Sequence, residues 1–97
     1  MKHFYVYILK CSDGSYYTGH TDNIEARISQ HQLGLIKKCY TSTRLPVDLV
    51  FHQDFGSRDE AFTAERKIKG WSRPKKEALI KGDWALISLL AKKDFVK

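Results

Sequence analysis

The fold is decided by residues 3–20, which read HFYVYILKCSDGSYYTGH. Residues 3–11 are rich in β-branched and aromatic side chains, which favour a β-strand. The dipeptide Asp13-Gly14 is typical of a tight hairpin turn, and residues 16–20 are expected to return as a second strand. The stretch therefore predicts an antiparallel hairpin near the amino end of the chain.

The register of this hairpin decides whether two of its tyrosines share a face. A two-residue turn at Asp13-Gly14 pairs Tyr7 with His20. The same turn pairs Tyr17 with Lys10, so that the two phenols lie on opposite faces of the sheet. An odd-length loop or a bulge would reverse the faces of one strand and bring the phenols together. The sequence allows both arrangements.

Beyond the hairpin the pattern predicts four helices and one more strand. The first helix is expected to be capped by Thr21 or Asp22 and to run to about Leu33, before the stop at Gly34. Residues 35–46 have no clear period and are expected to form a loop. The next strand spans 47–55, and its better buried face consists of Val47, Leu49 and Phe51.

The remaining helices are expected at 57–72, from Ser72 to about Ile80, and at 84–92. Ser57 and Glu60 form a capping box for the first of these, and Pro74 lies in the first turn of the second. The order strand–strand–helix–strand–helix–helix–helix predicts an α/β protein of the α+β kind, a small three-stranded antiparallel sheet flanked by helices. A chain of 97 residues without repeats or linkers is expected to form a single domain over 1–97.

Positive charge is concentrated in the last third of the chain. Residues 1–65 carry seven Lys or Arg and eight Asp or Glu, whereas residues 66–97 carry ten and three, within a net charge of +6. This asymmetry favours a polyanionic partner, nucleic acid first of all. The alternative is an ordinary solvated, lysine-rich surface.

The two cysteines, Cys11 and Cys39, belong to no cluster with zinc-ligand spacing. The amino-terminal residues MKHFYVYILKC are too short and too polar for a signal sequence or a membrane span. We therefore expect a cytoplasmic protein with reduced thiols and no membrane partner.

Glu65 is the carboxylate from which a functional site can be argued. It points with the apolar stripe of its helix, which consists of Ala61, Ala64, Ile68 and Trp71. A charge at the edge of a core needs a partner, and a divalent metal ion or a buried arginine would serve. Arg27 in the first helix could be that arginine. In the structural alternative, an Arg27–Glu65 ion pair only holds two helices together.

Local reasoning leaves the other candidates open as well. Each tyrosine of the hairpin is explained by sheet packing when it is taken alone. His31 lies four residues after Arg27 on the same helix face, and the helix dipole explains a histidine at that end equally well. Trp71 interrupts the basic run 66–76, where packing is a better explanation than base stacking.

Taken in order along the chain, these residues resemble the GIY-YIG nuclease superfamily. Its two tripeptides match Tyr5-Val6-Tyr7 and Tyr17-Thr18-Gly19, although the first Gly and both Ile residues are replaced. The arginine of its first helix matches Arg27, and the histidine one turn on matches His31. Its metal-binding glutamate matches Glu65, in the context AxxxERxIK.

The chain looks most like the small stand-alone, single-domain branch of that superfamily. That branch has a Tyr-Thr…Arg-x-Pro loop, here Tyr40-Thr41 and Arg44-Leu45-Pro46, and a KxW…KK tail, here Lys69, Trp71, Lys75 and Lys76. Many members also carry a late asparagine near the metal site. This chain has none after Asn23, and Lys69 or Ser72 is expected in that region.

The resemblance implies a metal-dependent endonuclease that hydrolyses phosphodiester bonds in DNA, in DNA repair or processing. RNA is the alternative substrate, and a protein partner could supply specificity. The implied cofactor is a single Mg²⁺ or Mn²⁺ ion bound by Glu65. The implied catalytic residues are Tyr7, Tyr17, Arg27, His31 and Glu65, and the expected nucleic-acid contacts are Tyr40, Arg44, Lys69, Arg73, Lys75 and Lys76. Two other hypotheses stay open: a binding module without cleavage, and a scaffold without a ligand.

Overall fold

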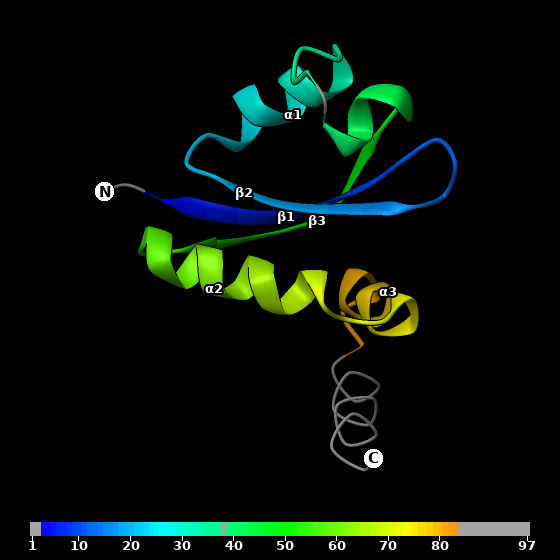
Figure 1. The fold of residues 1–97 in the computed structure, drawn as a ribbon. Coiled ribbons are helices and arrows are strands. Elements are labelled where there is room, and N and C mark those ends of the chain that lie inside the picture. The colour runs from blue at the N-terminus through cyan, green and yellow to red at the C-terminus, as the bar shows by residue number, and fades with distance from the viewer. Residues whose placement is uncertain (1–2, 38, 84–97) are drawn as a thin grey trace.

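The computed structural model describes residues 3–37 and 39–83. A three-stranded antiparallel sheet lies between two helical layers (Figure 1). Its strands are β1 (Phe4–Lys10), β2 (Tyr16–Thr21) and β3 (Asp48–Phe55), in the order β2-β1-β3. The helices are α1 (Ile24–Gln32), η1 (Tyr40–Thr43, a 3-10 helix), α2 (Arg58–Lys69) and α3 (Arg73–Lys81). The expected α+β fold is confirmed, while the helix expected at 84–92 lies outside the described residues.

The hairpin brings its two central tyrosines to one face of the sheet. Tyr7 pairs with Gly19, and Leu9 pairs with Tyr17. The strands are joined by residues 11–15, an odd-length loop whose ends are linked by a 2.8 Å hydrogen bond from the Cys11 N–H to the Ser15 carbonyl. The alternative with a two-residue turn is therefore wrong, and the alternative with an odd-length loop is confirmed. Within it Gly14 has a φ of 84°, which favours glycine.

A bulge in β3 changes the face that each of its side chains takes. Ile8 pairs with Phe51 and Leu9 with Leu49, so Val50 is an extra residue between the two pairs. The expected strict alternation is wrong for this reason. Val50 and Phe51 both pack against the core under α2, and Leu49 is exposed.

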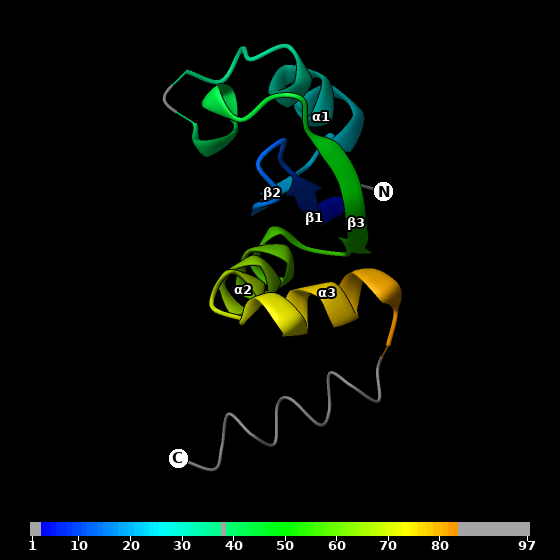
Figure 2. The ribbon, with the colours of Figure 1, turned by 90° about the vertical axis from the view of Figure 1, so that its right-hand side faces the viewer.

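The sheet separates two apolar cores, because successive residues of β1 point to opposite faces. On one face, Val6 and Ile8 pack with Ala61, Ile68 and Leu79 from α2 and α3. Trp71 packs against this core, as expected. On the other face the buried residues are Tyr7, Leu9, Cys11 and Val47, with Ile24 and Ile28 of α1 packed against them. Figure 2 shows α1 on one side of the sheet and α2 with α3 on the other.

The helix boundaries differ slightly from those expected. Asn23, not Thr21 or Asp22, caps α1, and its side chain accepts a hydrogen bond from the Ala26 N–H at 3.1 Å. Thr21 instead accepts from the Asn23 N–H, which fixes the cap one residue later. α2 starts after the expected cap Ser57 but ends at residue 69, with a separate turn before α3.

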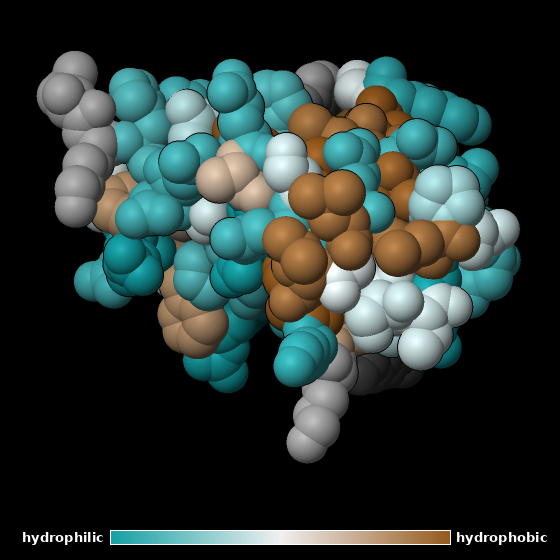
Figure 3. All heavy atoms as spheres, turned by 90° about the horizontal axis from the view of Figure 1, so that it is seen from above, coloured by the Kyte–Doolittle hydropathy of each residue, from teal (hydrophilic) through white to brown (hydrophobic). Residues whose placement is uncertain are grey.

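The face that carries α1 also exposes apolar side chains (Figure 3). Leu33 and Leu35 follow α1 and are largely exposed, and Leu49 of β3 lines a shallow hollow with Ile24 and Ile28. Each described helix is too short or too polar to cross a membrane.

Candidate active site

Two phenols and one imidazole meet between β1, β2 and α1. The Tyr7 hydroxyl lies 2.8 Å from Nε2 of His31 in a buried hydrogen bond. The Tyr17 ring centroid lies 5.2 Å from that of His31 and 6.3 Å from that of Tyr7. Tyr7 and His31 are each 1% exposed, whereas Tyr17 is half-buried. Tyr17 is therefore the phenol nearer the surface.

The second nitrogen of His31 is held by a residue that the sequence did not single out as functional. Nδ1 of His31 lies 2.8 Å from Oγ1 of Thr41 in η1, and that hydroxyl donates to Sγ of Cys39 at 3.5 Å. Thr41 is 1% exposed. Its one sequence signal was its place in the Tyr-Thr loop.

The phenols are held in their neutral form by burial. Burial, and next the neighbouring Tyr17, raise the pKa of Tyr7 well above its ordinary value of 10.0. Burial, and next the Cys39 thiol, raise the pKa of Tyr17 to about 12. Arg27 lowers both values and the charge of Glu65 raises both. Tyr7, Tyr17, Arg27 and Glu65 therefore lie close enough to interact electrostatically.

His31 is neutral at physiological pH for related reasons. Burial, and then the positive charge of Arg27, lower the pKa of His31 below its ordinary value of 6.5. A neutral imidazole next to a phenol can accept that phenol's proton. The arrangement therefore supplies a proton acceptor behind Tyr7.

Arg27 acts on this group from α1. Its guanidinium lies close enough to lower the pKa of both phenols, and its Nη1 is 3.5 Å from Oε1 of Gln30. Among the described residues, Arg27 makes no ion pair with Glu65. The Arg27–Glu65 ion pair considered from the sequence is therefore absent, and the guanidinium is available to an anion.

Glu65 approaches from α2, on the other side of the edge strand β2. It is 7% exposed and lies with the apolar stripe of its helix, as the sequence predicted. Nδ1 of His20 is 3.1 Å from its Oε1, and Nζ of Lys69 is 3.7 Å from the same oxygen. The sequence reasoning missed His20, which directly follows the second tripeptide.

The donor set at Glu65 fits a weakly held divalent cation. Within 3–37 and 39–83, no cluster of three or more His, Cys, Asp or Glu side chains could hold a metal ion. Mg²⁺ usually keeps several waters and is bound by one or two carboxylates together with substrate phosphates. The contacts of His20 and Lys69 with Glu65 both engage Oε1, so neither of them occupies Oε2. A single carboxylate of this kind fits that pattern.

Lys69 adjoins the phenols as well as the carboxylate. Its Nζ lies 5.8 Å from the centroid of the Tyr17 ring. Burial, and then the charge of Lys69, lower the pKa of Lys76, so the two ammonium groups are neighbours. Lys69 thus lies beside both Glu65 and the Tyr17 ring.

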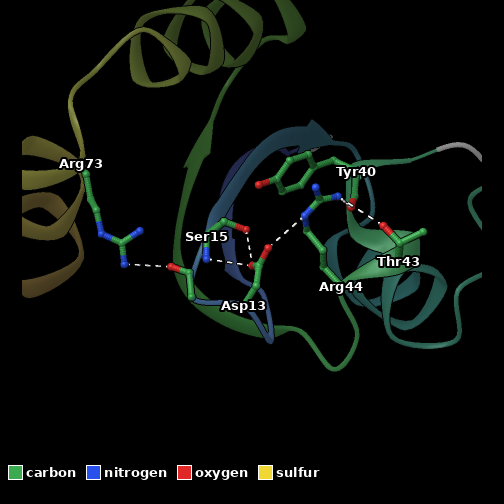
Figure 4. Close-up of polar contacts among 7 residues, drawn as sticks. Asp13, Ser15, Tyr40, Thr43, Arg44 and Arg73 are labelled. Carbon is green, nitrogen blue, oxygen red and sulfur yellow. Dashed lines mark hydrogen bonds and ion pairs between the residues drawn. The ribbon is translucent and has the colours of Figure 1, made fainter.

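The two arginines expected to contact nucleic acid brace the hairpin loop (Figure 4). Nε of Arg44 is 3.0 Å from Oδ2 of Asp13, and its Nη1 donates to the Tyr40 carbonyl at 2.8 Å. From the other side, Nη2 of Arg73 donates to the Gly14 carbonyl at 2.8 Å. Both guanidinium groups therefore already have protein partners.

The remaining expected nucleic-acid contacts differ in accessibility. Tyr40 is exposed, and its ring stacks near Tyr17 with the centroids 6.4 Å apart. Lys75 is 7% exposed, and its Nζ lies 4.3 Å from the centroid of the Trp71 ring. The structure thus brings Tyr40 and Lys69 toward Tyr17, leaves Lys76 beside Lys69, and turns Lys75 into the body of the protein.

Comparison with known proteins identifies related chains of similar size. The model of the GIY-YIG catalytic domain matches residues 3–78. A UPF0213 protein of Staphylococcus haemolyticus is 50% identical over 80 residues, which cover 82% of this chain and 96% of that protein. A UPF0213 protein of Natronomonas pharaonis is 46% identical over 76 residues, covering 78% and 88%.

Solved structures agree with the fold. The solution NMR structure of a UPF0213 protein from Bacillus halodurans has 44% sequence identity and a TM-score of 0.54, covering 81% of this chain and 83% of that one. The solution NMR structure of a protein from E. faecalis has 34% identity and a TM-score of 0.59, covering 88% and 90%. The resemblance inferred from the sequence is confirmed: this chain belongs to the GIY-YIG family, alongside the small UPF0213 proteins.

Proposed function

We propose that this chain is a metal-dependent endonuclease that hydrolyses phosphodiester bonds in DNA, in repair or processing. The observation that carries the proposal is the convergence of Tyr7, Tyr17, His31 and Arg27, with Glu65 near enough to change the pKa of both phenols. The free thiols Cys11 and Cys39 suit a reducing compartment such as the cytoplasm.

Glu65 would hold the divalent cation, Mg²⁺ or Mn²⁺. When bound there, the ion would supply charge neutralisation at the phosphate and at the departing 3′-oxygen. The carboxylate of Glu65 raises the pKa of Tyr7 and Tyr17. Neutralisation of this carboxylate would lower both pKa values, so that Tyr7 would give up its proton to His31 more readily.

Tyr17 and Tyr7 would divide the activation of water between them. Tyr17, nearer the surface, would orient the attacking water. As the water loses a proton to the Tyr7 oxygen, the proton of Tyr7 would pass to Nε2 of His31, which is neutral and already hydrogen bonded to it. The resulting hydroxide attacks phosphorus, and the bond to the 3′-oxygen breaks. The products are a 3′-hydroxyl and a 5′-phosphate.

Arg27 would bind the non-bridging phosphate oxygens, because its guanidinium lies near enough to lower the pKa of both phenols and has no acidic partner among the described residues. Lys69 and Lys76 would hold the flanking backbone without reading bases. A protein partner could add the specificity that such contacts do not give.

One observation favours a second function, nucleic-acid binding without cleavage. Lys69 lies within ion-pair distance of Glu65, and His20 is hydrogen bonded to the same carboxylate oxygen. A carboxylate satisfied in this way need not bind a cation. The two functions predict different results in a single assay.

The assay is the nicking of supercoiled plasmid with Mg²⁺ or Mn²⁺, measured together with DNA retention on a filter. Glu65→Ala and Arg27→Ala should abolish nicking and leave retention largely intact. Glu25→Ala and Arg58→Ala, at exposed positions, serve as matched controls. Retention without nicking by the wild type would establish the binding module. If the wild type shows neither retention nor nicking, the scaffold hypothesis remains.

A further inference from the structure

A chain of three hydrogen bonds runs behind Tyr7 and away from the surface of the site. The Tyr7 hydroxyl meets Nε2 of His31 at 2.8 Å. Nδ1 of His31 meets Oγ1 of Thr41 at 2.8 Å. Thr41 in turn donates its only hydroxyl proton to Sγ of Cys39 at 3.5 Å. The first two contacts are buried, so each donor in them needs its acceptor.

The hydrogen bond from Thr41 to Cys39 fixes which group donates in each of the other two hydrogen bonds. Because the Thr41 proton is engaged by Cys39, Oγ1 of Thr41 can only accept from His31. The proton of the neutral imidazole is then on Nδ1. Nε2 carries the lone pair and accepts the Tyr7 proton. The other tautomer would leave two acceptors, Nδ1 of His31 and Oγ1 of Thr41, facing each other in a buried contact.

We propose that Thr41 is a positioning residue, which fixes His31 in the tautomer protonated on Nδ1 and leaves Nε2 to accept the Tyr7 proton. The inference rests on the proposed function, since the Tyr7-to-His31 proton transfer is part of that mechanism. It assigns a role to a residue that touches neither substrate nor cation.

The surroundings of Thr41 support this role. Cys39 is a good acceptor: burial raises the pKa of its thiol, but hydrogen bonds from Thr41, from Tyr17 and from the Tyr40 backbone together bring it below its ordinary value of 9.0. The Arg44 N–H donates to the Thr41 carbonyl at 3.0 Å, and the Ser12 N–H donates to the Arg44 carbonyl at 2.9 Å. The backbone of Thr41 is therefore fixed to the hairpin that carries the phenols.

The test is the tautomer of His31 in the full chain labelled with ¹⁵N-histidine, read from the ¹⁵N resonances of its two ring nitrogens at neutral pH. The wild type should show a protonated Nδ1 and an unprotonated Nε2. Thr41→Val removes the hydroxyl at nearly constant volume and should abolish this preference. Thr41→Ser should restore it. Thr43→Val, the same change at an exposed position of η1, should leave the wild-type spectrum.

Kinetics supply the second readout. Thr41→Val should lower kcat for nicking by about 10- to 100-fold, part of the roughly 10²- to 10⁴-fold that acid–base catalysis contributes, with KM nearly unchanged. A wild-type His31 protonated on Nε2, or a Thr41→Val protein with wild-type resonances and rate, overturns the inference. If Thr41→Val does not fold, the wild-type spectrum decides the tautomer. Absence of nicking in the wild type overturns the proposed function instead, and the spectra still decide the role of Thr41.

Discussion

A methyl group on Gly19 would lie 2.5 Å from the hydroxyl oxygen of Tyr7 and 2.6 Å from its Cζ. The two residues are directly paired across β1 and β2. The missing side chain of Gly19 is thus the space into which the reactive end of Tyr7 fits. The glycine of the second tripeptide is required by packing against the tyrosine of the first.

Gly19→Ala should therefore displace the Tyr7 ring. Tyr7 cannot yield easily, since it is buried and hydrogen bonded to His31. We expect a loss of about 1–3 kcal/mol in the free energy of unfolding, the usual cost of overpacking, and loss of nicking. Denaturant unfolding and the plasmid assay measure the two effects. Gly56→Ala is the control, because a Cβ there has no atom within 4 Å. Equal stability of the two variants would refute the steric argument.

The stability of the protein should fall as the pH drops through about 6.5, in part because of His31. Burial and Arg27 lower the pKa of folded His31, so the unfolded chain binds the proton more readily. The contribution of His31 is then fully present above its unfolded pKa and is lost as the pH falls toward the folded value.

Denaturant unfolding between pH 8 and pH 5 checks this expectation. The His31→Gln protein should lose less stability over that range than the wild type. His52→Gln, at an exposed position of β3, should follow the wild-type curve. Parallel curves for the wild type and His31→Gln would show that His31 titrates alike in both states.

Thr18→Val should stabilise the protein. Oγ1 of Thr18 is buried and has no hydrogen-bond partner among residues 3–37 and 39–83. An unpaired buried hydroxyl is destabilising, so its replacement by a methyl group should raise the free energy of unfolding by about 1 kcal/mol. Thr21→Val on the same strand removes a hydroxyl that bonds the Asn23 backbone and should not stabilise. A gain in both variants would point to strand propensity instead.

Lys69→Gln should weaken DNA retention through a phosphate contact. The slope of log K against log salt should fall in magnitude by about 0.9 for duplex DNA, the value for one neutralised phosphate. Lys67→Gln on the same helix is the charge-matched control. Lys67 lines a different groove, beside Phe55 and Ala64, which contains none of the candidate catalytic residues. Titrations at several salt concentrations measure both. An equal change of slope for Lys69→Gln and Lys67→Gln would mean that DNA binding depends on the net charge of the protein and not on a contact at Lys69.

Much of the fold could be predicted because it depends on local chemistry. The strands around Asp13-Gly14 and the helix that begins after Ser57 follow from side-chain type and spacing. The position of Glu65 on the apolar stripe follows from the helical period alone. The bulge at Val50 could not be predicted, because it depends on how β3 pairs with β1 and not on its own residues.

The site could be predicted as a set of residue types, but not as an arrangement. Arg44 was expected to contact nucleic acid from the loop motif of the family, and Arg73 and Lys75 from the basic tail. The structure nevertheless engages all three with the protein itself. Thr41 and His20 gave little signal, because a hydrogen-bond partner is recognised only once the acceptor beside it is known.

By itself, the sequence determined the order of the three strands and of α1, α2 and α3, the family resemblance and the identity of the five candidate catalytic side chains. Only the tertiary structure decided that Tyr7 and Tyr17 share a face, because the facing of a strand depends on the length of the loop that sets its register. Likewise, only the structure placed His31 between Tyr7 and Thr41. The directions of buried hydrogen bonds depend on which groups the folded chain brings within about 3 Å of one another.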